Sequence, residues 1–235
     1  WKQADYETPH ALTLAEISAI RDDFRSAAEN AKQAGFDGVE VHGANGYLLD
    51  QFLQDGSNQR SDAYGGSIEN RARLLLEVVD DVIAIWGHGR TGVRLSPYGT
   101  FNDMQDSDPV ALFTHVLNKL NRRQIAYAHV IEPRATNAGG QDGSVETAPS
   151  AAALFRVLFN GAYISAGGYV PETAEATIAQ GDADAIAFGR YYISNPDLVA
   201  RIRQGAALAR YQRATFYGGN EKGYTDYPAY SADAT

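Results

Sequence analysis

The sequence contains no cysteine, and this absence excludes disulfides, thiolate-bound metals and iron–sulfur clusters from its 235 residues. It also lacks an excess of cations, since 20 lysines and arginines stand against 29 aspartates and glutamates. The resulting net charge of −9 argues against nucleic acid or an anionic membrane surface as the main partner, because phosphate binding needs clustered cations.

Long apolar runs are missing too, and none approaches the ~20 residues of a membrane span. The first residues lack the apolar core of a signal peptide, and they also lack an initiator methionine. We therefore expect a cytoplasmic protein with no membrane partner, and we expect the chain to be a piece of a longer polypeptide.

The composition is that of a globular protein. Hydrophobic residues make up 44% and charged residues 21%, and no stretch of biased composition divides the chain. We therefore expect a single domain over residues 1–235, ending in an ordered aromatic tail at about residues 211–230.

Short apolar segments alternate with amphipathic ones along the chain, which predicts a parallel sheet covered by helices. A long polar loop is expected from Gly43 to about Ser67, and a helix is expected to open at Asp108-Pro109. The expected strands are 38–42, 91–97, 125–131, 162–166 and 185–188, and the other expected helices are 14–34, 68–86, 171–180 and 195–203.

The loops that follow the strands are rich in glycine and polar residues, whereas the turns from helix to strand are short. This asymmetry predicts an α/β fold of the (β/α)8 TIM-barrel type, whose chemistry lies on the loops after the strands. A doubly wound open sheet is the alternative. A barrel needs eight strand–helix units in about 250 residues, and this sequence supplies five, which we assign to strands 4 to 8.

Three chemically active side chains follow the first expected strand, in the segment 41–47. The imidazole of His42 and the carboxamide of Asn45 can both donate hydrogen bonds to one substrate oxygen, which suits a developing oxyanion. Tyr47 adds a phenol that can deliver a proton. A loop histidine with satisfied hydrogen bonds beside a structural tyrosine is the alternative.

The four histidines other than His42 show no metal-ligand spacing, and no metal site is expected.

The segment 57–73 is too polar for a packed core, and we interpret it as a structured loop that enters a helix. Its side chains can brace the loop by hydrogen bonds to the backbone, so scaffolding rather than catalysis is the favoured role. The expected bracing residues are Asn58, Arg60, Asn70 and Arg71.

Arg94 lies inside an otherwise apolar strand, where an unpaired cation costs several kcal/mol, so it needs a protein carboxylate or an electron-rich ligand atom as partner.

The segments 165–169 and 188–190 follow the strands assigned as seven and eight. In a TIM barrel these two loops commonly form a phosphate site. Their glycines expose backbone N–H groups, and Arg190 adds a cation.

Together these motifs resemble the old yellow enzyme family of FMN-dependent ene-reductases, from about Pro9 to Pro228. The resemblance is carried by His42-Gly-Ala-Asn45-Gly-Tyr47 and its continuation to residue 52, by segments 57–60 and 64–71, and by the tail segments 216–219 and 223–228. It implies an oxidoreductase that uses non-covalent FMN and is reduced by NADPH or NADH, NADPH being the more frequent donor.

The resemblance also implies a role for each site residue. His42 and Asn45 are expected to bind the carbonyl or nitro oxygen of an activated alkene. Tyr47 is expected to protonate the α carbon after a hydride from flavin N5 reaches the β carbon. Arg94 is expected beside the electron-rich flavin ring. The remaining assignments are the phosphate-binding loops Ala166, Gly167, Gly168, Gly189 and Arg190, an aromatic at the pocket mouth, Tyr217, and a wall residue, Phe101.

The chain departs from the family pattern in one respect, because the first three strands of the barrel have no counterpart in it. We therefore expect an N-terminal barrel segment, in the same or a separate chain, to supply strands 1 to 3. Two other interpretations stay open: a non-catalytic flavin-binding fragment or subunit, and a phosphate-sugar barrel enzyme. The second of these gives no reason for His42, Asn45 and Tyr47 together.

Overall fold

The computed structural model describes residues 7–133, 149–217 and 220–230. The described residues form two compact units, a larger one over His10–Ile186 and a smaller one built mainly from residue 187 onward. The single domain expected over residues 1–235 stays a prediction, as does the extent of its tail, in which Gly218 and Gly219 lie outside the described residues.

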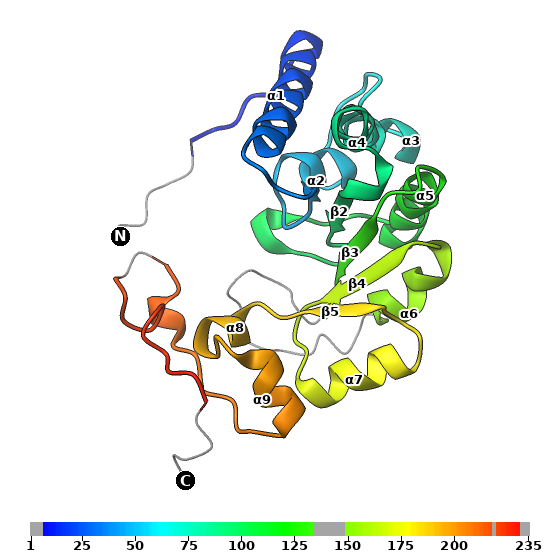
Figure 1. Ribbon diagram of the computed structural model, residues 1–235. Coiled ribbons are helices and arrows are strands. Elements are labelled where there is room, and N and C mark those ends of the chain that lie inside the picture. Colours follow the sequence, from blue (N-terminus) through cyan, green and yellow to red (C-terminus); the bar gives the residue numbers. More distant parts are fainter. Residues whose placement is uncertain (1–6, 134–148, 218–219, 231–235) are drawn as a thin grey trace. The chain divides into compact units, whose positions relative to one another are not determined.

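A parallel sheet forms the centre of the larger unit (Figure 1). Its strands lie in the order of the sequence, and the first four pair in parallel. They are β1 (Val39–Gly43), β2 (Thr91–Leu95), β3 (Tyr127–Ile131), β4 (Ala162–Ala166) and β5 (Ala185–Ala187). Sequential parallel strands joined by helices are the build of a (β/α)8 TIM barrel, and the expected α/β fold with part of a barrel is confirmed.

Helices cover one face of this sheet. In the larger unit they are α1 (Leu14–Gln33), α2 (Leu48–Leu53), α3 (Ile68–Arg71), α4 (Arg73–Trp86), α5 (Pro109–Arg122), α6 (Ala151–Phe155) and α7 (Pro171–Ala179). The smaller unit contains α8 (Arg190–Ser194) and α9 (Leu198–Gln204). Short 3-10 turns are η1 (His88–Arg90), η2 (Phe101–Asp103), η3 (Arg156–Leu158) and η4 (Arg213–Thr215).

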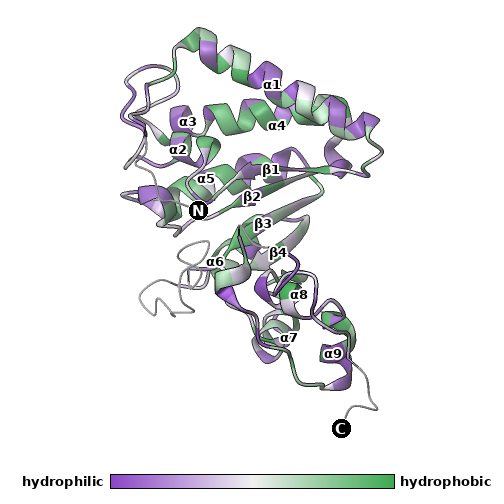
Figure 2. Cartoon of the chain, turned by 90° about the vertical axis from the view of Figure 1, so that its left-hand side faces the viewer, coloured by the Kyte–Doolittle hydropathy of each residue, from purple (hydrophilic) through white to green (hydrophobic). Residues whose placement is uncertain are grey.

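In the larger unit, the inner helix α4 is more hydrophobic than the outer helix α1. Helix α4 packs against β1 and β2 on one side and against α1 on the other, and Figure 2 shows it as mainly hydrophobic. Its buried residues include Leu74, Val78 and Val82. Helix α1 is amphipathic, and only Ile17 and Ala28 of its side chains are fully buried, because its outer face meets water.

Two helix starts match the sequence prediction. Thr13 and Glu16 form a capping box at α1, in which the Thr13 Oγ1 accepts from the Glu16 backbone N–H at 3.2 Å and the Glu16 carboxylate accepts from the Thr13 N–H at 2.7 Å. Asp108 caps α5, where its carboxylate accepts from the Ala111 N–H at 3.0 Å and Pro109 takes the first helical position.

Several expectations about the helices are corrected by the structure. The expected polar loop from Gly43 to Ser67 contains α2, whose Leu49, Phe52 and Leu53 are buried against the core. The helix expected over 68–86 is interrupted at Ala72, and the short helices α6 and α8 were not expected.

The helix expected from residue 195 begins only at Leu198. Asn195 instead ends α8, because its side-chain amide donates to the Tyr191 carbonyl at 2.9 Å and to the Ala209 carbonyl at 3.1 Å. The same side chain accepts from the Ala209 N–H at 2.7 Å. Asn195 therefore stabilises the turn after α8 by hydrogen bonds, and it does not begin a helix.

The two faces of the sheet differ in polarity. Alternate residues of the strands are buried and apolar, among them Val41, Val93, Leu95, Ala128 and Val130. The residues between them carry most of the polar side chains of the sheet, which are Glu40, His42, Arg94, Tyr127 and His129. The helices thus cover the apolar face, and the polar face is available for chemistry. In the described part of the chain, no helix has the length and apolar character that a membrane crossing requires.

Candidate active site

The loop after β1 is held in an unusual backbone conformation. Asn45 and Gly46 have φ angles of 59° and 70°, so two consecutive residues occupy the left-handed region. A Cβ atom at Gly46 would lie 2.4 Å from the carbonyl oxygen of Phe101 and 2.7 Å from the Cβ of Asn102. Only glycine permits this approach, and the loop is thereby packed against the 3-10 turn η2.

A buried carboxylate holds the same loop through hydrogen bonds. Asp50 is fully buried, and its Oδ2 accepts from the Gly46 N–H at 2.9 Å and from the Ser96 hydroxyl at 3.1 Å. Ser96 in turn accepts from the Asn45 N–H at 2.8 Å. Burial raises the pKa of Asp50, and the hydrogen bonds from Gln54, Gly46 and Ser96 oppose that rise.

Sequence reasoning did not identify Asp50 or Ser96. The available signal was a charged residue enclosed by apolar neighbours, in Leu48-Leu49-Asp50-Gln51-Phe52. A carboxylate in such a position must find hydrogen-bond donors, and here they come from the loop that carries Asn45.

The expected catalytic and wall residues lie together in the larger unit. The ring centroids of His42 and Tyr47 are 5.6 Å apart, and those of Tyr47 and Phe101 are 6.5 Å apart. Tyr47 is the N-cap residue of α2 and is 53% exposed. Partial burial and the charge of Arg94 lower the pKa of His42. The imidazole is therefore neutral near pH 7 and keeps one N–H to donate.

Arg94 lies next to His42 in the register of the sheet. Its guanidinium is partly buried, and its Nε atom is buried without a hydrogen-bond partner among the described residues. Burial lowers the pKa of Arg94, and the charge of Glu40 opposes this. A buried donor without an acceptor is costly, so the arrangement suits an electron-rich ligand atom at this point.

The loop after β4 turns at two consecutive glycines. Gly167 and Gly168 have φ angles of 103° and 65°, and they follow the buried Ala166. The loop is anchored through Ser165, whose hydroxyl lies 2.8 Å from that of Tyr169 and 3.1 Å from the carboxylate of Glu132.

The buried carboxylate of Glu132 also accepts from two backbone N–H groups at the start of α6, those of Ala151 at 3.1 Å and Ala152 at 2.9 Å. It therefore ties the ends of β3 and β4 to that helix.

The smaller unit carries the other expected cofactor and pocket residues. Gly189 precedes α8, and the guanidinium of Arg190 lies 5.5 Å from the ring centroid of Tyr211. The rings of Tyr211 and Phe216 are 5.5 Å apart, and those of Phe216 and Tyr217 are 6.5 Å apart. A phosphate site shared by residues 166–168 and 189–190, and a pocket mouth at Tyr217, stay predictions.

Side chains of segment 57–73 brace the loop by hydrogen bonds, as expected, and a scaffolding rather than a catalytic role stays a prediction. The Asn58 amide donates to the carbonyls of Phe52 at 2.6 Å and Tyr64 at 2.8 Å, and Arg60 donates to the Leu12 carbonyl at 2.6 Å. Arg71 donates to the Leu53 and Gly66 carbonyls as expected, whereas the side chain of Asn70 accepts from the side chain of Arg73 at 2.8 Å rather than bonding to the backbone. Among the residues that the structure describes, no group of histidine and carboxylate side chains is arranged to hold a metal ion.

Comparison with known proteins agrees with this geometry. The model of the NADH:flavin oxidoreductase / NADH oxidase family matches residues 2–209. The putative 12-oxophytodienoate reductase 4 of Oryza sativa subsp. japonica is 48% identical over 225 residues, which are 95% of this chain and 58% of that protein. The 12-oxophytodienoate reductase 2 of Arabidopsis thaliana is 43% identical over 233 residues, 99% of this chain and 61% of that protein.

Solved structures give the same result. Morphinone reductase in complex with tetrahydroNAD superposes with a TM-score of 0.87 at 45% identity, covering 97% of this chain and 60% of that one. An old yellow enzyme homologue from Zymomonas mobilis gives a TM-score of 0.88 at 40% identity, covering 96% and 62%. The chain thus spans about three fifths of the length of these relatives. It belongs to the NADH:flavin oxidoreductase / NADH oxidase family, that of the old yellow enzymes and their FMN-dependent, nicotinamide-using relatives.

Proposed function

We propose that this protein is an ene-reductase, which uses FMN and a nicotinamide donor, NADPH in the first place, to reduce the C=C bond of α,β-unsaturated carbonyls and nitroalkenes. The observation that carries the proposal is the loop of His42, Asn45 and Tyr47, fixed by buried hydrogen bonds and placed beside Arg94 on the polar face of the sheet.

The residues present fit FMN. The buried Nε of Arg94 lacks an acceptor among the described residues, and the ring nitrogens and oxygens of a flavin would supply one. Gly167 and Gly168 form a turn whose backbone N–H groups can donate to a phosphate. When bound, FMN supplies the hydride chemistry, and the protein supplies position and charge.

The side chains divide the remaining work between them. His42, neutral near pH 7, and Asn45 donate hydrogen bonds to the carbonyl or nitro oxygen of the alkene. When a hydride reaches the β carbon, negative charge builds on that oxygen, and these donors stabilise it. Tyr47 then gives its phenolic proton to the α carbon, and the resulting phenolate is reprotonated from water. Phe101, whose ring faces Tyr47, forms a wall of the alkene pocket.

We also propose that an N-terminal segment, in the same polypeptide or in a separate one, supplies strands 1 to 3 and completes the barrel. Two observations support this. The chain spans about three fifths of its relatives. The polar face of the sheet carries buried nitrogen atoms, Arg94 Nε and His129 Nε2, that lack partners among the described residues and would meet whatever fills the barrel interior.

One experiment tests cofactor and completeness together. We expect purified protein to be yellow, with flavin absorbance that NADPH bleaches without oxygen and that cyclohexenone restores. The intact mass should exceed 25.4 kDa or reveal a second polypeptide. A yellow protein that NADPH bleaches but no enone reoxidises would favour the non-catalytic flavin-binding alternative. Bound flavin in a lone 25.4 kDa chain would contradict the proposed N-terminal segment.

A substitution at Asp50 tests how the active loop is held. Asp50→Ala leaves the Gly46 N–H and the Ser96 hydroxyl without an acceptor, so the free energy of unfolding is expected to fall by ~1–3 kcal/mol. The KM for an enone should rise, while the rate of flavin reduction by NADPH should change little. These quantities are measured by urea titration and by steady-state and stopped-flow kinetics.

Asp50→Asn is the matched control, since its carbonyl oxygen can still accept from Gly46 and Ser96, and Gln54 can turn its amide to accept. This variant should stay close to the wild type in stability and in KM. Equal losses in both variants would mean that the negative charge of Asp50, rather than its accepted hydrogen bonds, maintains the loop.

A further inference from the structure

The polar face of the sheet is organised in two rows that cross β1, β2 and β3. The register aligns His42, Arg94 and His129 in the row near the ends of the strands. The row below it consists of Glu40, Gly92 and Tyr127. Glu40 is therefore the one carboxylate in the two rows, and it lies directly beneath the row that contains Arg94.

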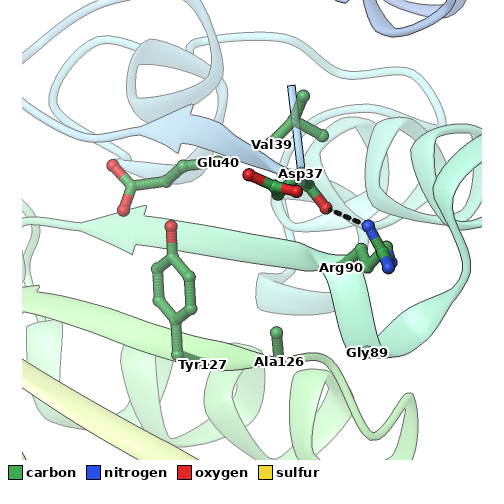
Figure 3. A pocket seen from close by; sticks show the side chains of 8 residues that line it. Asp37, Val39, Glu40, Gly89, Arg90, Ala126 and Tyr127 are labelled. Carbon is green, nitrogen blue, oxygen red and sulfur yellow. Dashed lines mark hydrogen bonds between the residues drawn. The ribbon is translucent and has the colours of Figure 1, made fainter. Parts of the chain in front are cut away.

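Glu40 is bound to β3 across the strand between them. Its Oε2 lies 2.9 Å from the Nδ1 of His129. The hydroxyl of Tyr127 points towards the carboxylate of Glu40, as Figure 3 shows. Both contacts favour the ionised form of Glu40, and the pKa of this carboxyl is lowered although its partial burial acts to raise it.

Gly92 makes the contact with Tyr127 possible. A Cβ atom at position 92 would lie 2.2 Å from the Cζ of Tyr127, so the ring occupies the place of the missing side chain. The ring thus lies across β2 and brings its hydroxyl to β1. The carboxylate of Glu40 is thus held by His129 and lies on the side to which the Tyr127 hydroxyl points.

This fixed negative charge acts on the cation above it. Arg94 has no ion pair with a carboxylate among the described residues, and Glu40 is the acidic group whose charge bears on it. Glu40 also opposes the effect of Arg94 on His42. The carboxylate of Glu40 therefore reduces the positive electrostatic potential around His42 and Arg94, where the proposed alkene site and flavin site meet.

We propose that Glu40 is a positioning residue of the reaction, which offsets part of the Arg94 charge and so lowers the reduction potential of the flavin bound against Arg94. This rests on the proposed function. Reduction adds negative charge to the flavin, so the Arg94 cation favours the reduced form and a nearby carboxylate disfavours it. The offset keeps the reduced flavin a stronger hydride donor towards the alkene.

The test is the midpoint potential of the bound flavin in the complete, flavin-loaded protein. Glu40→Gln removes the charge but keeps an oxygen that can accept from Tyr127 and His129. It should shift the ratio of reduced to oxidised flavin about tenfold at a given potential, which for two electrons raises the midpoint by about 30 mV. Reoxidation by cyclohexenone should slow in the same variant.

Two control variants separate charge from structure. Glu29→Gln removes an equal charge from an exposed position of α1 and should leave the potential unchanged. Tyr127→Phe removes the hydroxyl that points towards Glu40 but no charge, and its potential should stay near that of the wild type. A Glu40→Gln potential equal to the wild type, or a shift of the same size in either control, would overturn the proposal.

A second readout does not need flavin. In the flavin-free protein, Glu40→Gln should lower the pKa of His42, followed by NMR of the imidazole, because a neighbouring negative charge is lost. An unchanged His42 titration would overturn the electrostatic role of Glu40 in its own right. A wild-type protein that binds no flavin, with the His42 shift present, would instead refute the proposed function and leave the charge arrangement standing.

Discussion

Replacing Tyr47 with phenylalanine is expected to slow the reoxidation of reduced flavin by an enone by about 10²–10⁴-fold, the range of a positioned general acid. Reduction of the flavin by NADPH should be unaffected, because that half-reaction needs no proton from Tyr47. The ring should stay in place, since it packs beside His42 and Phe101 at the start of α2. Stopped-flow absorbance of the two half-reactions measures both effects.

Tyr64→Phe is the matched control for this substitution. Its hydroxyl donates to Glu77 at 2.9 Å within the scaffold, away from the loop of Tyr47. The control should leave both half-reactions unchanged, although it loses a hydrogen bond. If Tyr47→Phe also leaves both half-reactions unchanged, the proton comes from another group, and the assignment of Tyr47 as proton donor is wrong.

Replacing Arg71 with methionine is expected to lower the free energy of unfolding by ~3–5 kcal/mol, the cost of breaking a buried ion pair from one side. The Nη1 atom of Arg71 donates to the Oδ2 of Asp106 at 2.6 Å, and the two side chains are only 6% and 1% exposed. Arg71 also donates to the carbonyls of Leu53 and Gly66. The substitution therefore leaves a buried carboxylate without its cation and removes two loop contacts.

Urea titration with matched m-values measures this loss. The control is Arg123→Met, which removes an arginine from an ion pair with Asp80, a side chain that is 54% exposed. Exposed pairs contribute about 0–1 kcal/mol, so the control should be nearly neutral. Similar small losses in both variants would show that the Arg71 contacts have only a minor effect on stability.

Local signals in the sequence were sufficient for most of the fold. The helix expected from residue 14 begins at Leu14, Asp108 and Pro109 specified the start of α5, and the strand expected at 162–166 was found with the same bounds. These features depend on neighbours within a few residues. Helix α2 was missed because its polar residues, Asp50 and Gln51, hid an apolar set that is buried on contact with the rest of the core.

The candidate site depends more on contacts between distant residues. The sequence brought His42, Asn45 and Tyr47 together because they share one short loop. It carried no sign that Ser96 would receive the Asn45 N–H from 51 residues away, or that Glu40 would meet His129 from 89 residues away. Such pairs follow from the parallel register of β1, β2 and β3, which a single sequence does not encode locally.

The close approach at Gly46 bears on which positions around the proposed alkene pocket can be varied. Gly46 touches the main-chain oxygen of Phe101, while the side chain of Phe101 turns to Tyr47. The backbone at position 101 thus packs against the loop of Gly46, whereas the side chain of Phe101 takes no part in that contact. A library of substitutions at Phe101 should therefore reshape the proposed pocket for bulkier or smaller alkenes while the loop of Asn45 and Gly46 keeps its conformation, whereas any substitution at Gly46 should displace that loop and abolish activity towards all of them.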